Sequence, residues 1–198
     1  SNTISNRRVI IPLVRRAITG LNLLPSSGNY IYNTSVVSAF NQTIGSSDNI
    51  NVNNDDGKAD ARYSFDKMLE EYPNLESVGV ITTWYGSTAD DAMTIQPRLD
   101  VNNDYSSFSQ DWSVGSYNKD NALTTTITSQ GKSNVGGTPD DGGLIEFIDL
   151  CNERGIKVML YPFLQMDTEN KEWRGQIQFD GTQAGLDAWF STYTDFIR

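Results

Sequence analysis

The chain has 198 residues with no histidine, one cysteine and a formal net charge of −10, and its mean hydropathy is −0.45. The lack of histidine excludes Ser-His-Asp and Cys-His catalysis and most zinc sites, so acid–base chemistry must rest on carboxylates, Tyr or Lys. The acidic balance argues against nucleic acid as the main partner. No cofactor is expected, and no membrane insertion either, because no apolar run approaches the roughly 20 residues that cross a bilayer.

Residues 1–60 are expected to form an N-terminal extension that contains a β-hairpin. Residues 17–24 predict a strand, Pro25-Ser26-Ser27-Gly28 predicts a turn, and residues 30–32 predict a strand that pairs back. Residues 41–60 are rich in Asn, Asp, Ser and Gly, and they predict a polar loop.

Two polar segments superficially resemble calcium loops. In residues 51–57 the glycine is out of register for an EF-hand and no acidic residue closes the loop, and residues 100–104 are followed by Tyr105 where glycine is needed. We interpret both as solvated turns, with calcium binding as the weaker alternative and no metal site expected.

Residues 61–198 are expected to form the N-terminal part of a barrel-like α/β domain. Asp60 is expected to cap a short helix that ends before Pro73, and residues 78–84 predict a buried strand. Residues 87–134 are too long for an ordinary connection. They predict a β-rich insertion above the carboxyl end of the strands, with short strands near 94–96, 112–114 and 123–128.

The segment 135–167 carries the clearest helix and strand signals. Thr138 predicts an N-cap, Pro139 the first helical position, and Gly155 a left-handed residue after the helix. Apolar residues at helical spacing predict one buried face, with Cys151 as a small core residue: Leu144, Phe147, Ile148 and Cys151. Residues 156–163 then predict a buried strand, which completes a β-α-β unit. Asp167 follows it at the carboxyl end, where α/β folds place their chemistry.

A last helix is expected after Thr182. Its apolar stripe is expected to face a core: Leu186, Trp189, Phe190, Tyr193, Phe196 and Ile197. Such a stripe calls for a further strand and helix layers, so we expect the chain to be a piece of a longer polypeptide. Its free strand edges would favour pairing with another copy, and hence a homo-oligomer.

Several short segments occur in one order along the chain: Pro73-Asn74-Leu75, Trp84-Tyr85-Gly86, Ile95-Gln96-Pro97-Arg98, Gly136-Gly137-Thr138-Pro139-x-Asp141, Arg154-Gly155-Ile156-Lys157-Val158, Tyr161-Pro162-Phe163-x-x-Met166-Asp167 and Trp173-Arg174-Gly175. This order resembles the TIM-barrel, glycoside-hydrolase-like domain of the tail-tip or baseplate hub protein of gene transfer agents and related tailed phages. The resemblance runs from about Ala17 to the end of the chain.

The resemblance implies a partial (β/α)₈ barrel. It also implies a place in the tail of a phage-like particle that is made in the bacterial cytoplasm. The implied partners are envelope polysaccharide or peptidoglycan and other tail or baseplate proteins. The chain departs from the family pattern in two respects. The loop 168–172 is shorter than is usual in the family. The later part of the family domain does not follow; in the family it includes a Gly-Ser-Glu-Leu-like segment that would hold a glycosidase-type acid. Two barrel strands are therefore expected here.

Three carboxylates are candidates at the carboxyl rim of the strands. Glycosidases use two carboxyl groups, about 5–5.5 Å apart for retention and about 6.5–9.5 Å apart for inversion. Asp167 is the best placed, as a general acid or base or as a contact to a sugar hydroxyl; alternatively it caps a loop or pairs with Arg174. Asp90 and Asp91 are the other two, and solvated or helix-capping positions are the alternative for them.

Aromatic residues near the same rim are candidates for sugar contact. Trp84 and Tyr85 end the first strand and would stack on a sugar ring, or else pack the rim. Trp173 and Arg174 would form one wall of a cleft, or else a structural clamp of Arg on Trp. Tyr161 is expected in the core. Residues 136–138 match no phosphate-loop spacing and predict a tight turn with a cap.

The leading hypothesis is a tail-tip domain that engages, and with its carboxylates hydrolyses, glycan of the cell envelope. The rival is a barrel without catalysis that serves as a structural or adhesive baseplate module. A secreted calcium-bound adhesin is the third alternative. Hydrolysis by this chain alone is not expected, because the second carboxylate falls outside it.

Overall fold

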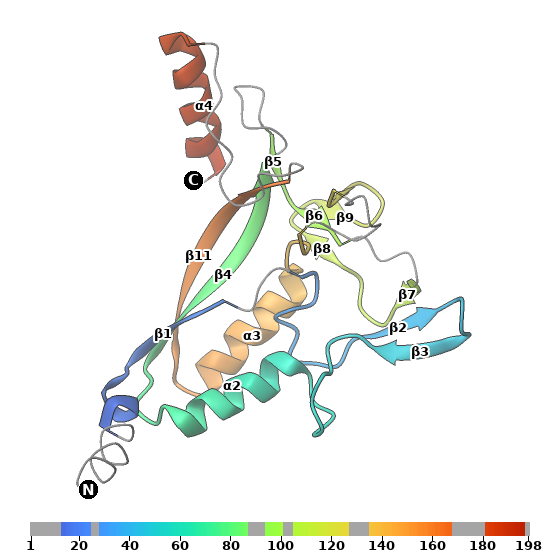
Figure 1. Ribbon diagram of the computed structural model, residues 1–198, viewed down its shortest axis with the longest axis vertical. Helices are drawn as coiled ribbons and strands as arrows, with labels where there is room; N and C mark the ends of the chain where they lie inside the picture. Colours follow the sequence, from blue (N-terminus) through green and yellow to red (C-terminus); the bar gives the residue numbers. More distant parts are fainter. Residues whose placement is uncertain are drawn as a thin grey trace, which may run out of the picture.

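The computed structural model describes residues 13–24, 28–86, 94–100, 105–126, 135–167 and 181–196. Its central sheet holds three parallel strands in the order β1–β4–β11 (Figure 1). These are β1 (Gly20–Leu23), β4 (Ser77–Gly86) and β11 (Lys157–Met166), and a short antiparallel strand, β5 (Ile95–Gln96), pairs with the end of β4. The described strands do not close a barrel.

The predicted β-α-β unit is confirmed. Helix α3 (Asp141–Glu153) connects the insertion to β11, which runs parallel to β4 along its full length. The register places Leu164 opposite Trp84 and Met166 opposite Gly86. The two strands therefore end at the same level, and Asp167 directly follows that end.

One face of the sheet packs against α3 and α2 (Asp60–Glu71), and it forms the main core (Figure 1). Val78 and Val80 of β4 point to this face and are fully buried, and Phe147 of α3 meets Phe65 of α2 edge-on at 5.3 Å. Cys151 is fully buried in the same cluster, which confirms the prediction of a small core residue.

The predicted hairpin between residues 17–24 and 30–32 is wrong. β1 pairs with β4 as a third parallel strand, and residues 29–32 form a turn. The reason is burial: Leu21 and Leu23 stand in register with Val78 and Val80 and pack on the same core. A hairpin would have left these leucines without that contact.

A hairpin forms across the start of the segment 41–60, which we predicted to be a loop. Strands β2 (Ser38–Asn41) and β3 (Ser46–Asn49) pair antiparallel, and Gly45 takes the left-handed conformation (φ 68°) that their turn requires. On its other side, β2 pairs with β7 (Tyr105–Phe108) of the insertion. The N-terminal region and the insertion thus share a sheet.

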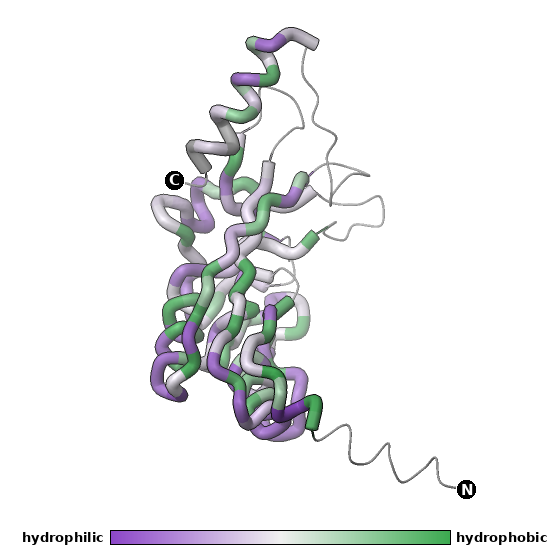
Figure 2. The backbone as a smooth tube through the Cα atoms, turned by 90° about the vertical axis from the view of Figure 1, so that its left-hand side faces the viewer, coloured by the Kyte–Doolittle hydropathy of each residue, from purple (hydrophilic) through white to green (hydrophobic). Residues whose placement is uncertain are grey.

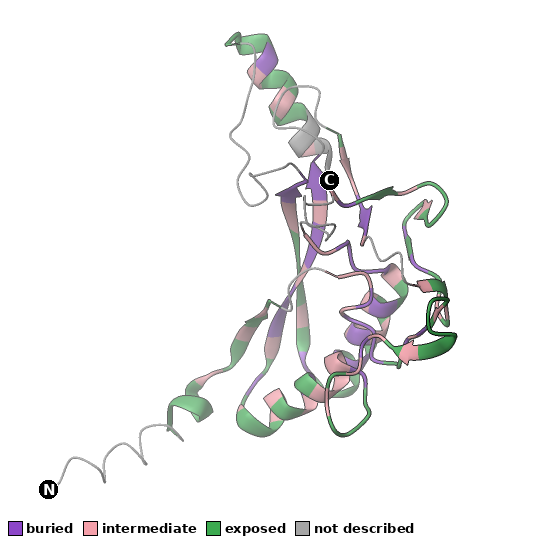
Figure 3. Cartoon of the chain, turned by 45° about the vertical axis from the view of Figure 1, so that its right-hand side comes forward, coloured by how far each residue is buried: buried purple, intermediate pink, exposed green. Residues whose placement is uncertain are grey.

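The insertion is β-rich, as expected, and it builds a second core. Its remaining strands are β6 (Arg98–Leu99), β8 (Ser113–Val114), β9 (Tyr117–Asn118) and β10 (Leu123–Thr124). Trp112 is the centre of the second core, with Tyr30, Val37, Leu99 and Val114 around it. Figure 3 shows buried segments both here and along the upper half of β4.

The predicted N-caps of α2 and α3 are wrong by one and two residues. Asp140, not Thr138, caps α3, because its side chain accepts a hydrogen bond from the Gly143 N–H at 3.1 Å. Ala59 is the N-cap of α2, and Asp60 instead binds the preceding loop, where its carboxylate accepts the Asn53 N–H at 2.8 Å. The left-handed Gly155 (φ 72°) is confirmed.

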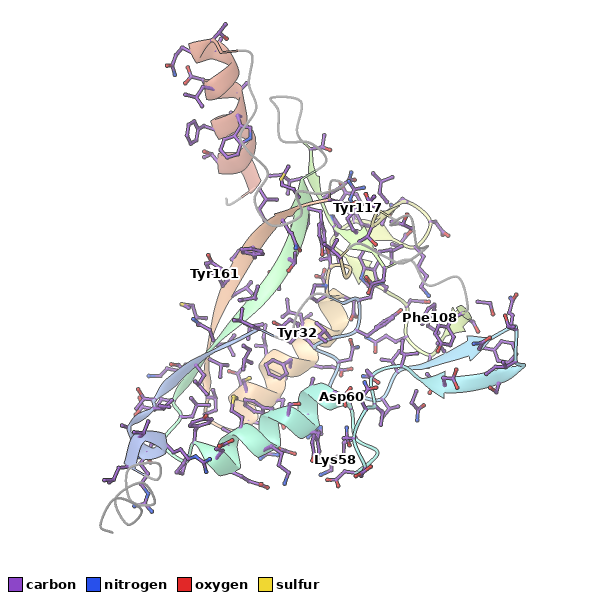
Figure 4. All side chains as sticks on the ribbon, viewed as in Figure 1. Tyr32, Lys58, Asp60, Phe108, Tyr117 and Tyr161 are labelled. Atoms are coloured by element: carbon purple, nitrogen blue, oxygen red, sulfur yellow. The ribbon has the colours of Figure 1, made fainter. Side chains whose placement is uncertain are left out.

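β11 is less buried than predicted. Met159, Leu160 and Tyr161 are about half exposed, and Figure 4 shows Tyr161 projecting from the strand away from α2 and α3. The predictions of a buried strand and a core Tyr161 are therefore wrong, because no described strand pairs with the outer edge of β11.

Helix α4 (Gln183–Phe196) stands apart from the rest of the fold (Figures 1 and 2). Thr182 caps it, as predicted, by accepting the Gly185 N–H at 3.1 Å. Phe190 is half exposed, however, so its side chain does not face a core as we expected.

Gly137 is a position where a side chain cannot be tolerated. An added Cβ would meet the Asn29 Oδ1 and would lie 2.8 Å from two backbone atoms, the Arg98 oxygen and the Asp100 nitrogen. Overpacking of this kind costs typically 1–3 kcal/mol. We expect Gly137→Ala to lower the free energy of unfolding by about 3 kcal/mol in urea titrations. Gly28→Ala is the control, because its Cβ would make only ordinary contacts, at 3.7 and 4.0 Å. Equal stability of the two variants would contradict this packing.

The cap of α3 predicts a pH dependence. Burial raises the pKa of Asp140 from 3.8 to about 6, although hydrogen bonds from Gly143 and Gln110 oppose the rise. A carboxyl with a raised folded pKa contributes stability that is fully present below its unfolded pKa of 3.8 and is lost as pH rises through 6. Asp140→Asn keeps a capping oxygen but cannot ionise.

We expect the stability of the native chain relative to Asp140→Asn to fall between about pH 4 and pH 6 in urea titrations. Asp149→Asn, on the exposed side of α3, is the control. A stability difference that stays constant across this range would rule out Asp140 as the source.

Candidate active site

The candidate site lies where β4 and β11 end together. Asp167, just beyond β11, is 8% exposed, and its backbone N–H donates to the Gly86 oxygen at 3.2 Å. The insertion covers this end through β5 and β6 (Figure 1). The carboxylate is therefore enclosed by protein and does not stand on an open rim.

Two groups of the insertion hold the Asp167 carboxylate. The Arg98 Nε lies 3.4 Å from Oδ2, and the Thr126 N–H donates to Oδ1 at 2.9 Å. The side chains of the ion pair are only 6% and 4% exposed. Oδ1 is thus hydrogen-bonded, whereas Oδ2 has an ion-pair contact with an Arg98 Nε that makes no hydrogen bond. Asp167 joins the end of β11 to two separate parts of the insertion.

This arrangement agrees with the structural alternative for Asp167 more closely than with the catalytic one. The expected partner was Arg174, but Arg174 lies outside the described residues, and the structure pairs Asp167 with Arg98. A general acid or base must reach the glycosidic oxygen or a water molecule. Here Oδ1 accepts the Thr126 N–H, and Oδ2 lies 3.4 Å from the Arg98 Nε, a group that makes no hydrogen bond. A catalytic role for Asp167 stays a prediction.

The two aromatic residues at the end of β4 point to opposite faces of the sheet. Tyr85 is fully buried, and its hydroxyl donates a hydrogen bond to the Gly136 oxygen. Trp84 is partly buried and packs against the second core. Tyr85 therefore has the packing role that we gave as the alternative to sugar stacking, and Trp84 lies mainly against the insertion.

The other candidates fall outside the described residues. These are Asp90, Asp91, Trp173 and Arg174. Their roles in catalysis or in a sugar cleft stay predictions.

Thr138 and Arg98 connect the site to α3, and the sequence did not single out their roles. The Arg98 N–H donates to the Thr138 Oγ1 at 3.1 Å, and the Thr138 N–H donates to the Arg98 oxygen at 2.8 Å. Trp112 adds a bond from its Nε1 to the Thr138 oxygen at 2.8 Å. Arg98 was part of a segment that carries the family resemblance, and that was the one signal available for it.

Within the described ranges, no group of three or more His, Cys, Asp or Glu side chains is arranged to hold a metal ion. In the same ranges, no helix has the length and apolar character to cross a membrane. The arrangement at the strand ends consists of one ion pair, one buried tyrosine and the backbone groups that bind them.

The buried ion pair predicts that removing one partner destabilises the protein more than removing both charges. Removing one partner of a buried pair leaves an uncompensated charge and costs about 3–5 kcal/mol. We expect Arg98→Met to lower the free energy of unfolding by that amount. Arg98→Met combined with Asp167→Asn should recover part of the loss, because no lone charge remains.

Arg154→Met is the matched control for this experiment. Its ion pair with Asp66, at 3.0 Å, has side chains 43% and 26% exposed. Exposed pairs contribute about 0–1 kcal/mol, so this variant should lose little. A double variant that is no more stable than Arg98→Met alone would contradict the coupling between Arg98 and Asp167.

Comparison with known proteins gives one family. Residues 107–198, a little under half of the chain, match the family model of Glycoside Hydrolase Family 113. No curated protein matches the chain at a significant level. The match runs from the last two residues of β7 through α4, including α3, β11 and Asp167, and this part of the chain is glycoside-hydrolase-like.

Proposed function

We propose that the chain is a glycoside-hydrolase-like domain of a phage-derived tail-tip protein, where it engages glycan of the bacterial envelope, either peptidoglycan or surface polysaccharide. The observation that carries this proposal is the match of residues 107–198 to Glycoside Hydrolase Family 113. The place in a tail rests on the order of the short segments from Pro73 to Gly175, which resembles tail-tip proteins. In that setting the other partners are tail and baseplate proteins.

The parallel sheet supports the glycan part of the proposal. In barrel enzymes the ligand lies at the carboxyl ends of the strands. Here β4 and β11 end together, and β5 of the insertion pairs with the last two residues of β4. A glycan would approach the protein from this side.

A second candidate function is a non-catalytic structural or adhesive module. The Arg98–Asp167 pair favours it, since the described carboxylate at the strand ends is buried, forms an ion pair and accepts a backbone hydrogen bond. Hydrolysis through a pair of carboxylates needs a second group within about 10 Å. The described residues at the strand ends supply one carboxylate, and the candidates Asp90 and Asp91 lie outside the described ranges. We therefore propose glycan binding as the activity of this chain, with cleavage as the outcome that the experiment below separates from it.

The test is to incubate the purified chain with purified peptidoglycan and, separately, with extracted surface polysaccharide. We expect the chain to sediment with one of the insoluble glycans and to release no reducing ends. Release of reducing ends with binding would establish hydrolysis and overturn the non-catalytic assignment. No binding to either glycan would overturn the proposal as a whole.

The tail-tip assignment is checked on particles. Mass spectrometry of tail particles purified from the source bacterium should detect peptides of this chain. If the peptides are absent from the particles while the protein is present in the cells, the tail-tip assignment is wrong. The proposal of glycan binding would not be affected.

A further inference from the structure

A pocket of about 360 Å³ lies between the N-terminal region and the insertion, away from the strand ends. It is lined by residues from the segment 28–31, from the end of the β2–β3 hairpin, from the start of α2 and from β6, β7 and the segment after β9. Figure 4 labels two of them, Asp60 at the start of α2 and Phe108 on β7. Its size is near the lower end of the range for ligand sites, about 300–1,000 Å³. This size suits a small molecule or one unit of a polymer.

One wall of the pocket is apolar and well ordered by packing. Ile50, Leu99 and Phe108 belong to the second core and also line the pocket. The Phe108 ring is fixed by the Tyr30 ring at a centroid distance of 5.6 Å. The C–H face of a sugar is apolar, so a wall of this kind can hold one.

A cation stands at the edge of that wall. The Lys119 Nζ lies 4.0 Å from the centroid of the Phe108 ring, and Lys119 also lines the pocket. Partial burial lowers its pKa. Among the described residues no carboxylate forms an ion pair with Lys119. Its N–H groups are therefore available to donate to a ligand oxygen.

The opposite wall is polar, and its groups are held in place. Asn29 and Asp100 exchange two bonds: the Asn29 N–H donates to the Asp100 Oδ2 at 3.3 Å, and the Asp100 N–H donates to the Asn29 Oδ1 at 3.1 Å. These bonds leave the amide nitrogen of Asn29 without a partner in the described part of the chain. Asp60 is positioned by its bonds to Asn53 and Asn54.

The charges of the lining select the class of ligand. Asp60 and Asp100 face one cation, Lys119, so a phosphate or another multivalent anion would meet net repulsion. Burial already raises the pKa of Asp100, and the described carboxylates form no metal-binding group. A neutral ligand with several hydroxyl groups meets both donors and acceptors without adding charge.

We propose that this pocket binds a single neutral sugar residue of an envelope glycan, with the sugar ring against Phe108 and its hydroxyl groups bonded to Lys119 and Asn29. The inference rests on the proposed function and adds a second point of contact, away from the ends of β4 and β11. Two polar segments that the sequence analysis considered as calcium loops, around Asn51 and Asp100, meet at this pocket.

The test is to titrate the full chain, labelled with ¹⁵N, with N-acetylglucosamine, glucose and galactose in turn, and to follow the amide resonances. At least one sugar should shift the resonances of Asn29, Asn51 and Lys119 and leave those near Asp167 unchanged. Lys119→Ala should raise the Kd for that sugar about tenfold, as expected for the loss of one hydrogen bond from a charged donor. Lys119 is exposed, so the variant should fold.

Lys157→Ala, an exposed lysine on β11 far from the pocket, is the control and should bind like the native chain. Three results would overturn the proposal: no sugar shifts these resonances, the shifts gather at the strand ends, or Lys119→Ala binds as tightly as Lys157→Ala. Inorganic phosphate is titrated in parallel, and shifts at the pocket with phosphate instead of sugar would also overturn it. If Lys119→Ala sediments with envelope glycan to the same extent as the native chain, the pocket proposal is wrong and the proposed function still holds.

Discussion

The ion pair between Arg98 and Asp167 joins the insertion to the end of the central sheet, beside the β5–β4 pairing and the bond from the Thr126 N–H. Asp167 ends β11, and Arg98 belongs to a two-residue strand of the insertion. Because both side chains are almost fully buried, neither charge can be solvated by water. Each depends on the other, and the position of the insertion over the sheet depends on both.

The backbone around Arg98 extends this connection to the helix layer. Thr138 exchanges hydrogen bonds with Arg98 just before α3 begins, and Trp112 binds the Thr138 oxygen. Gly137 has no side chain, and this allows the segment to approach Asn29 and Asp100 closely. Gly137 therefore serves the close approach of two chain segments, and this explains the glycine before α3 without an anion site.

The sequence predicted those parts of the fold that are encoded locally. The helix signals between Thr138 and Gly155 and the apolar runs on either side were enough to derive α3, β4, β11 and their parallel arrangement. Asp167 was predicted at the carboxyl end because it directly follows the apolar run 156–163, and parallel strands end at the same edge of a sheet.

The failures have a different physical origin, because they concern pairing and burial at long range. Nothing local in residues 17–24 distinguishes a hairpin strand from one that pairs in parallel with β4, since both need alternating apolar residues. The partner of Asp167 is a basic residue in either case, and the choice between Arg98 and Arg174 depends on how the insertion folds. The exposure of Tyr161 and Phe190 depends on which elements cover them, and their own sequence carries no information about that.

Two roles compete for Asp167, one in packing and one in proton transfer. A general acid or base must present a carboxyl oxygen to the substrate or to a water molecule. In this structure Oδ1 accepts the Thr126 N–H at 2.9 Å, and Oδ2 lies 3.4 Å from the buried Arg98 Nε. The backbone N–H of Asp167 also donates to the Gly86 oxygen at 3.2 Å, so the residue is tied to both long strands and to the insertion. With this partner, the carboxylate is better suited to hold the insertion in place than to transfer protons.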